Sequence, residues 1–70
     1  MTSLKYRFAK RLQEVRSKAG ITQEELAEKA DISVRALAYL EGAENGCKFS
    51  NLEPLAKGIG VDVKDLFDFN

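Results

Sequence analysis

Four residues near the middle of the chain have the types and the spacing to touch another molecule closely. They are Val34, Arg35, Ala38 and Tyr39. At about 100° per residue they share one side of a helix, opposite the apolar Ala36, Leu37 and Leu40. Small side chains let a helix approach a surface, and the guanidinium of Arg35 can donate two hydrogen bonds to O6 and N7 of guanine. Tyr39 could contact a thymine methyl group, a base edge or a phosphate. The alternative is that Arg35 and Tyr39 are ordinary exposed residues.

Two short helices with a tight turn between them would hold this face in place. Thr22 precedes the segment QEELAEKA, and Ser33 precedes VRALAYLEG. Each hydroxyl can cap a helix by accepting a hydrogen bond from a backbone N–H that otherwise lacks a partner. Glu25 completes a capping box with Thr22, and apolar pairs five residues apart flank both caps as hydrophobic staples. The stretch Ile21–Gly42 is therefore predicted to be a helix-turn-helix.

A longer helix is predicted before this unit. Apolar residues recur there every three or four positions, which is the period of one helix face. They are Leu4, Phe8, Leu12, Val15 and Ala19. Ser3 can cap this helix and Gly20 can end it, so we expect a helix over residues 4–19.

A polar stretch, residues 42–50, follows the helix-turn-helix and contains an Asn-Gly step typical of a turn. We expect Phe49 to anchor this loop to the core. Cys47 is the single cysteine of the chain, and a lone cysteine in a polar loop is most often a bystander thiol. No role is assigned to it.

Two further helices are predicted after this loop. Asn51 is preferred to Ser50 as the first cap because Pro54 then falls at the third helical position, where its missing N–H does no harm. A last short helix is expected over residues 63–67. Five helices without a strand pattern predict an all-α fold in a single domain, residues 1–70.

Composition excludes several classes of function. With one cysteine and no histidine among 70 residues, an internal disulfide is impossible and a zinc site is very unfavourable. Without histidine, a glycine-rich phosphate loop or clustered carboxylates, no catalytic constellation can be assembled, so we expect neither an enzyme nor a metal or cofactor site. No apolar run approaches the roughly 18 residues of a membrane span. We expect a soluble, intracellular protein.

Charge is balanced overall but unevenly distributed. Eleven basic and eleven acidic residues cancel, which taken alone counts against a nucleic-acid binder. Residues 1–18 hold six basic residues and one acidic residue, a net charge of +5, whereas residues 51–70 hold two basic and four acidic residues, a net charge of −2. Such a molecule can present one face to an anion, although solvated helix faces explain the same pattern.

Two segments resemble the Cro/cI-type (XRE) family of helix-turn-helix DNA-binding domains. They are TQEELAEKADIS with VRALAYLEG, and LEPLAKGIGVDVKDLF; the resemblance runs from about Phe8 to Phe67. It implies a compact five-helix, lambda-repressor-like fold whose helix-turn-helix is formed by helices 2 and 3. In the phage repressors that define this docking mode, the third helix lies in the major groove, and a dimer binds half-sites about one helical turn apart.

The resemblance assigns roles to particular residues. The base-reading positions are Val34, Arg35, Ala38 and Tyr39, and residues that contact the DNA backbone or brace the fold are Arg16, Thr22, Gln23, Ser33, Lys48 and Asn51. An ion pair between Arg16 and Glu41 would tie helix 1 to the end of helix 3. The family's basic loop after this glutamate is replaced by GAENGCK, in which Lys48 is the only cation, so modest affinity is expected.

We therefore predict a sequence-specific transcriptional regulator that binds operator double-stranded DNA as a homodimer. By resemblance it would be cytoplasmic, of a bacterial or phage type, and no small-molecule ligand is inferred. The alternative is a protein-interaction module of the same fold, such as an antitoxin or an accessory regulator. Apolar residues near the C-terminus are candidates for the dimer interface, although the first two could instead close the core: Leu66, Phe67 and Phe69.

Overall fold

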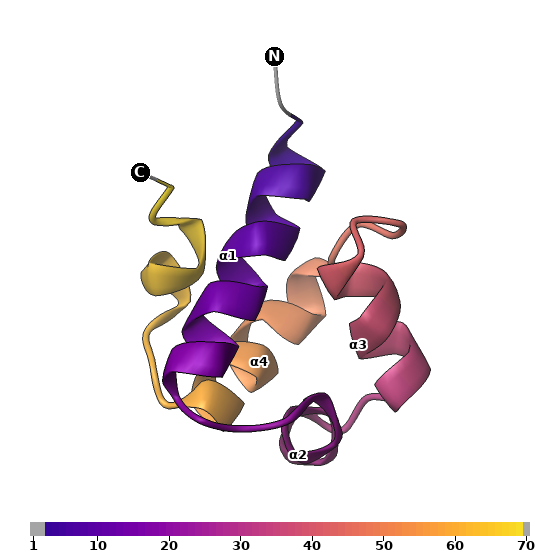
Figure 1. The fold of residues 1–70 in the computed structure, drawn as a ribbon, viewed down its shortest axis with the longest axis vertical. Coiled ribbons are helices and arrows are strands. Elements are labelled where there is room, and N and C mark those ends of the chain that lie inside the picture. Colours follow the sequence, from indigo (N-terminus) through magenta and orange to yellow (C-terminus); the bar gives the residue numbers. More distant parts are fainter. Residues whose placement is uncertain (1–2, 70) are drawn as a thin grey trace.

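A computed structural model describes residues 3–69, which form four α-helices and two short 3-10 segments (Figure 1). In chain order these are α1 (Leu4–Lys18), α2 (Gln23–Ala30), α3 (Val34–Glu41), η1 (Phe49–Asn51), α4 (Leu52–Ile59) and η2 (Val63–Phe67). The described part of the chain contains no strand, as predicted. The longest helix has 15 residues, and none of the described helices is long and apolar enough to cross a membrane.

The predicted count of five helices is not confirmed: the described residues form four α-helices, and the last predicted helix is the 3-10 segment η2. Its first turn is closed by a backbone hydrogen bond of 3.0 Å from Asp65 N–H to the Asp62 carbonyl. The Asp62 N–H in turn donates to Asp65 Oδ2 over 3.1 Å. Five residues closed by bonds of this i to i+3 type make a 3-10 turn, a form that is common in such short pieces.

Three of the predicted caps form as expected. Side-chain oxygens of Ser3, Thr22 and Ser33 accept hydrogen bonds from backbone N–H groups three residues later. The capping box is complete, because the Thr22 N–H also donates to Glu25 Oε1 over 2.8 Å. Each helix of the helix-turn-helix therefore starts where its own local sequence dictates.

Asn51 takes the predicted N-cap position of α4, but the expected side-chain cap does not form. Its backbone is already helical (φ −93°, ψ −9°), and its side chain makes no capping hydrogen bond. The chain begins to coil one turn earlier, at Phe49, and the Asn51 N–H donates to the carbonyl of Lys48 over 2.9 Å. Because η1 leads directly into α4, the Asn51 N–H has a backbone partner already, and Pro54 still occupies the third position of α4.

The turn between α2 and α3 is tight and uses a left-handed residue. Asp31 has φ 57° and ψ 45°, a conformation that costs most residues energy but that aspartate tolerates better than most. The next N–H, that of Ile32, donates to the Ala27 carbonyl over 3.0 Å. This closes α2 in the way that a glycine usually closes a helix.

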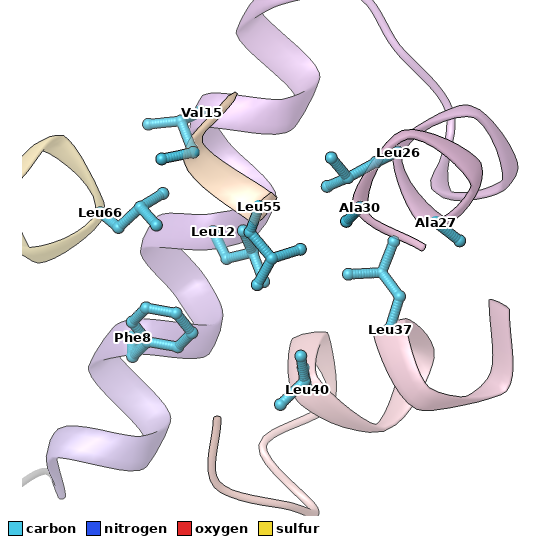
Figure 2. Close-up of a cluster of buried hydrophobic side chains, with 11 residues drawn as sticks. Phe8, Leu12, Val15, Leu26, Ala27, Ala30, Leu37, Leu40, Leu55 and Leu66 are labelled. Atoms are coloured by element: carbon cyan, nitrogen blue, oxygen red, sulfur yellow. The ribbon is translucent and has the colours of Figure 1, made fainter. Parts of the chain in front are cut away.

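The core lies between α1 and the other helices (Figure 2). Its fully buried large side chains come from every α-helix and from η2: Leu12, Leu26, Leu37, Leu55 and Leu66. α1 packs against α3 and η2, and α2 packs against α3 and α4. At Gly58 an added Cβ would lie 2.9 Å from Leu26 Cδ1, so α4 approaches α2 closely. The helix-turn-helix is thus packed against both α1 and α4.

Phe49 does not anchor the loop after α3, contrary to the prediction. It is 90% exposed. Cys47 and Leu52, on either side of it in sequence, are partly buried and pack against the core instead. With these two side chains covering the core at this point, the Phe49 ring points into solvent.

Candidate nucleic-acid interface

The outer face of α3 is the surface that the residue types predicted. Its four predicted contact residues are all exposed: Val34, Arg35, Ala38 and Tyr39. On the other side of the helix, Leu37 and Leu40 are buried in the core. Among residues 3–69 the Arg35 guanidinium makes no ion pair or hydrogen bond, so its donors are free to bind another molecule. The face combines one free cation and one phenol with two small side chains.

Behind this face, a buried carboxylate holds the C-terminal end of α3. Glu41 is only 4% exposed, and its side chain accepts two hydrogen bonds from Arg16. Arg16 Nε lies 2.6 Å from Glu41 Oε2, and Arg16 Nη2 lies 3.0 Å from Oε1. This is the predicted ion pair in its bidentate form, which is both stronger and more directional than a single contact. The hydrogen bonds to Glu41 raise the pKa of the Arg16 guanidinium.

Two glutamines and a backbone carbonyl extend this ion pair into a network. Gln23 Nε2 donates to Glu41 Oε1 over 2.9 Å, and Gln13 Nε2 donates to the Glu41 carbonyl. Arg16 Nη1 reaches the carbonyl of Ile21, just before α2, over 2.9 Å. The network therefore joins α1, α2 and the end of α3, and most of its bonds involve the charged Arg16 or Glu41 side chain.

Gln13 was missed by the sequence reasoning. It precedes Arg16 by three positions, a spacing that places both side chains on the same face of α1. Following the predicted ion pair along that face would have found it. Gln23, in contrast, lies where the resemblance placed a bracing residue; its amide has two N–H donors, and one of them is used by Glu41.

The residues expected to contact the DNA backbone lie on two sides of α3. Thr22, Gln23 and Ser33 lie at the starts of α2 and α3. Lys48 and Asn51 line a shallow hollow beside α3, together with Asn45, Ser50 and the α3 residues Ala36 and Leu40. The loop is held against α3 because the Glu44 N–H donates to the Tyr39 carbonyl over 2.9 Å. Lys48 is exposed at this hollow and can approach an anion there.

Most of the positive charge of α1 does not belong to this surface. Arg7 lies over the Phe69 ring, with 5.1 Å between the guanidinium carbon and the ring centroid. Arg11 pairs with Glu14 and donates through Nε to the Asp65 carbonyl over 2.7 Å. These residues line a hollow between α1 and the C-terminal segment, whereas Arg16 faces α3. The N-terminal excess of charge is thus turned away from the exposed face of α3.

The candidate dimer residues near the C-terminus divide between core and surface. Leu66 is 0% exposed, so the prediction that it contacts a partner is wrong; it closes the core, which was the alternative. Phe67 is 37% exposed, and its ring centroid lies 5.3 Å from that of Phe8. Phe69 is half-buried beside Phe67 and Arg7.

These features together define a helix-turn-helix domain with its third helix exposed, and the chain belongs to the helix-turn-helix domain family, which it matches over residues 7–68. It is 32% identical over 63 residues to Control protein C.BamHI of Bacillus amyloliquefaciens. The aligned region covers 89% of this chain and 78% of that protein. It is 28% identical over 68 residues to Control protein C.MunI of Mycoplasma sp, covering 96% and 92% of the two chains.

Solved structures agree with this assignment. The fold matches the restriction-modification controller protein C.AhdI from Aeromonas hydrophila with a TM-score of 0.87 at 25% identity, covering 90% of this chain and 96% of that chain. It matches the clp gene regulator ClgR from C. glutamicum with a TM-score of 0.90 at 25% identity, covering 96% and 87%. The resemblance seen in the sequence is therefore confirmed at the level of family and fold.

Proposed function

We propose that this protein is a sequence-specific DNA-binding transcriptional regulator, a control protein like its relatives, that acts on operator DNA as a homodimer in the cytoplasm. The observation that carries the proposal is the exposed face of α3, held rigidly from behind by the buried Glu41 network. A side chain that reads a base must be placed within hydrogen-bond distance, and rigid support from neighbouring groups supplies that precision. The names of its relatives, two control proteins and a gene regulator, support the same function.

Base reading would fall to the α3 face. With α3 in the major groove, Arg35 would donate two hydrogen bonds to the edge of a guanine, and the small Val34 and Ala38 would allow the helix to approach the base pairs. Tyr39 would reach a thymine methyl group, a base edge or a phosphate. Base contacts of this kind set the sequence preference of the protein.

Backbone contacts would fix the register of the protein on DNA. Gln23 keeps one N–H donor free after bonding Glu41, and this donor can reach a phosphate beside the start of α2. Lys48 and Asn51 would contact the backbone on the other side of α3. Lys48 is the one cation in this hollow, so we expect modest affinity and a shallow salt dependence.

The test is selection from a random pool of duplex DNA, followed by binding to the recovered site across a salt series. Arg35→Ala should cost about 1–3 kcal/mol and relax one base position. Lys48→Ala should weaken all sites alike and reduce the salt slope by about one. Lys10→Ala, on the far side of α1, serves as the matched control and should leave the slope unchanged. Recovery of no sequence motif would overturn sequence-specific binding.

A second candidate function is a protein-interaction module, such as an antitoxin or accessory regulator. It is favoured by the zero net charge and by the turning of the Arg7 and Arg11 side of α1 away from α3. If the random pool yields no motif while Arg35→Ala and Tyr39→Ala abolish capture of a protein partner, the α3 face serves protein recognition instead.

A further inference from the structure

Two cations on the outer side of α1 have no anionic partner. Arg7 and Lys10 are exposed, and among residues 3–69 neither side chain makes an ion pair or a hydrogen bond. Their neighbour Arg11 differs, because it pairs with Glu14 and its Nη2 lies 3.8 Å from Asp68 Oδ2. The unbalanced positive charge of this side of α1 is therefore carried by Arg7 and Lys10.

Aromatic rings hold both of these cations. The Arg7 guanidinium carbon lies 5.1 Å from the centroid of the Phe69 ring, and Lys10 Nζ lies 5.9 Å from the centroid of the Tyr6 ring. A cation within about 6 Å of a ring face is attracted to it. The two cations are three positions apart in sequence, so they are neighbours on the helix surface. Side chains that are already held in this way lose less entropy when they bind an anion together.

Both cations line a hollow between α1 and the C-terminal residues 68 and 69, which we call the α1 hollow. Its volume of about 490 Å³ lies within the range of roughly 300–1,000 Å³ that is usual for ligand sites, so it has room for a few side chains of a partner. The C-terminal segment packs along one side of α1, and α3 packs on the other (Figure 1). A partner bound in the α1 hollow would therefore not compete with a molecule bound at the α3 face.

The chemistry of the α1 hollow fits an acidic peptide better than a nucleic acid. Arg7 and Lys10 can each bond a carboxylate, whereas the carboxylates of Glu14 and Asp68 line the same hollow and repel a continuous chain of phosphates. Single-stranded nucleic acids are held by stacking their bases on aromatic rings, but each ring here already has a cation over one face. Tyr6 is 47% exposed, so its ring can still contact an apolar side chain.

We propose that the α1 hollow is a docking site for an acidic segment of a different protein. Two carboxylates of this segment bind Arg7 and Lys10, and a neighbouring apolar side chain packs against Tyr6. Charge complementarity of this kind selects acidic partners and excludes basic ones. The contact is small, so the complex is weak and transient. This proposal goes beyond the proposed function and does not depend on what the α3 face binds.

The test uses a short fluorescein-labelled peptide in which pairs of glutamates alternate with leucines. Fluorescence anisotropy follows its binding to the intact chain. The peptide should bind with a Kd below about 1 mM at low salt and more weakly as salt is added. A double variant, Arg7→Gln with Lys10→Gln, should raise this Kd about tenfold, because two charge-assisted bonds are lost from a partly exposed site.

A second double variant, Lys29→Gln with Lys57→Gln, is the matched control. It removes the same charge from two exposed lysines at a hollow between α2 and α4, and it should bind the peptide within about twofold of the wild type. All four substituted side chains are exposed, so both double variants should keep the circular dichroism spectrum of the wild type. Arg35→Ala, on the α3 face, should also bind the peptide normally.

Several results would overturn the proposal. One is no binding of the peptide below about 1 mM, and another is equal binding of a peptide with glutamine in place of every glutamate. An equal loss in the two double variants would show that only net charge matters. If Arg7→Gln with Lys10→Gln instead prevents self-association in sedimentation, or weakens binding to random duplex DNA, these cations serve a second copy of the chain or a nucleic acid.

Discussion

The helix-turn-helix and the segment that follows it, residues 43–51, obey different rules. α2 and α3 each begin at a hydroxyl cap that bonds an N–H three residues away, and the side chains around these caps pack as the staple spacing predicts. In the following segment Phe49 points outward and Asn51 caps nothing. The first region is determined by neighbours within about five positions. The structure of the second region depends on which parts of the core are covered by side chains from elsewhere in the chain.

The two regions therefore have different roles: one fixes the geometry of the α3 face, and the other closes the end of α3. The proposed base-reading face of α3 needs a fixed geometry, and local caps together with the buried Glu41 provide it. The loop needs only to close α3, which it does through backbone bonds such as that from Glu44 N–H to the Tyr39 carbonyl. Its exposed side chains are therefore free to serve another purpose, and Phe49, which is 90% exposed, is the clearest case.

The largest difference in the free energy of unfolding is expected between substitutions of two apolar residues, one in each region. Leu37→Ala removes a fully buried side chain and should lower the free energy of unfolding by about 2–5 kcal/mol, since the cavity left behind adds to the lost transfer energy. Phe49→Ala removes a larger side chain, yet it should change this free energy by less than about 0.5 kcal/mol in dilute, monomeric protein. Urea unfolding at low micromolar concentration measures both. Equal losses would mean that Phe49 is part of the core after all.

An effect of similar size is expected at the buried carboxylate. Glu41→Ala leaves the Arg16 guanidinium and the amide of Gln23 without their acceptor, so we expect a loss of about 3 kcal/mol or more. Glu44→Ala, an exposed glutamate in the loop, is the control and should be neutral within about 0.5 kcal/mol. Thermal or urea unfolding at low salt compares them. A neutral Glu41→Ala would show that the network does not hold α3.

Much of the fold could be predicted because its signals are local. Cap residues, staple pairs and the spacing of α1 all lie within one or two turns of the structure they determine, and the exposed side of α3 follows from its helical period. The partners of Glu41 were half predicted: Arg16 came from the resemblance, whereas Gln13 meets Glu41 across 28 positions of sequence. The burial of Leu66 and the exposure of Phe49 depend on which side chains from distant parts of the chain cover the core, and no short-range sequence pattern shows that.

The smallest difference in stability is expected between substitutions of two residues that the sequence predicted to have the same role. Thr22 and Asn51 were both predicted caps, but only the Thr22 hydroxyl accepts a hydrogen bond, from Glu25 N–H over 3.1 Å. Thr22→Ala should therefore cost about 1 kcal/mol. Asn51→Ala should be neutral for stability, because η1 already supplies a backbone partner for its N–H. Paired urea titrations resolve a difference of this size. If Asn51→Ala proved as costly as Thr22→Ala, α4 would have to begin with a side-chain cap. Its start would then be determined by nearby residues, as the starts of α2 and α3 are. If it is neutral for folding but weakens DNA binding, then the asparagine is retained there for the phosphate contact.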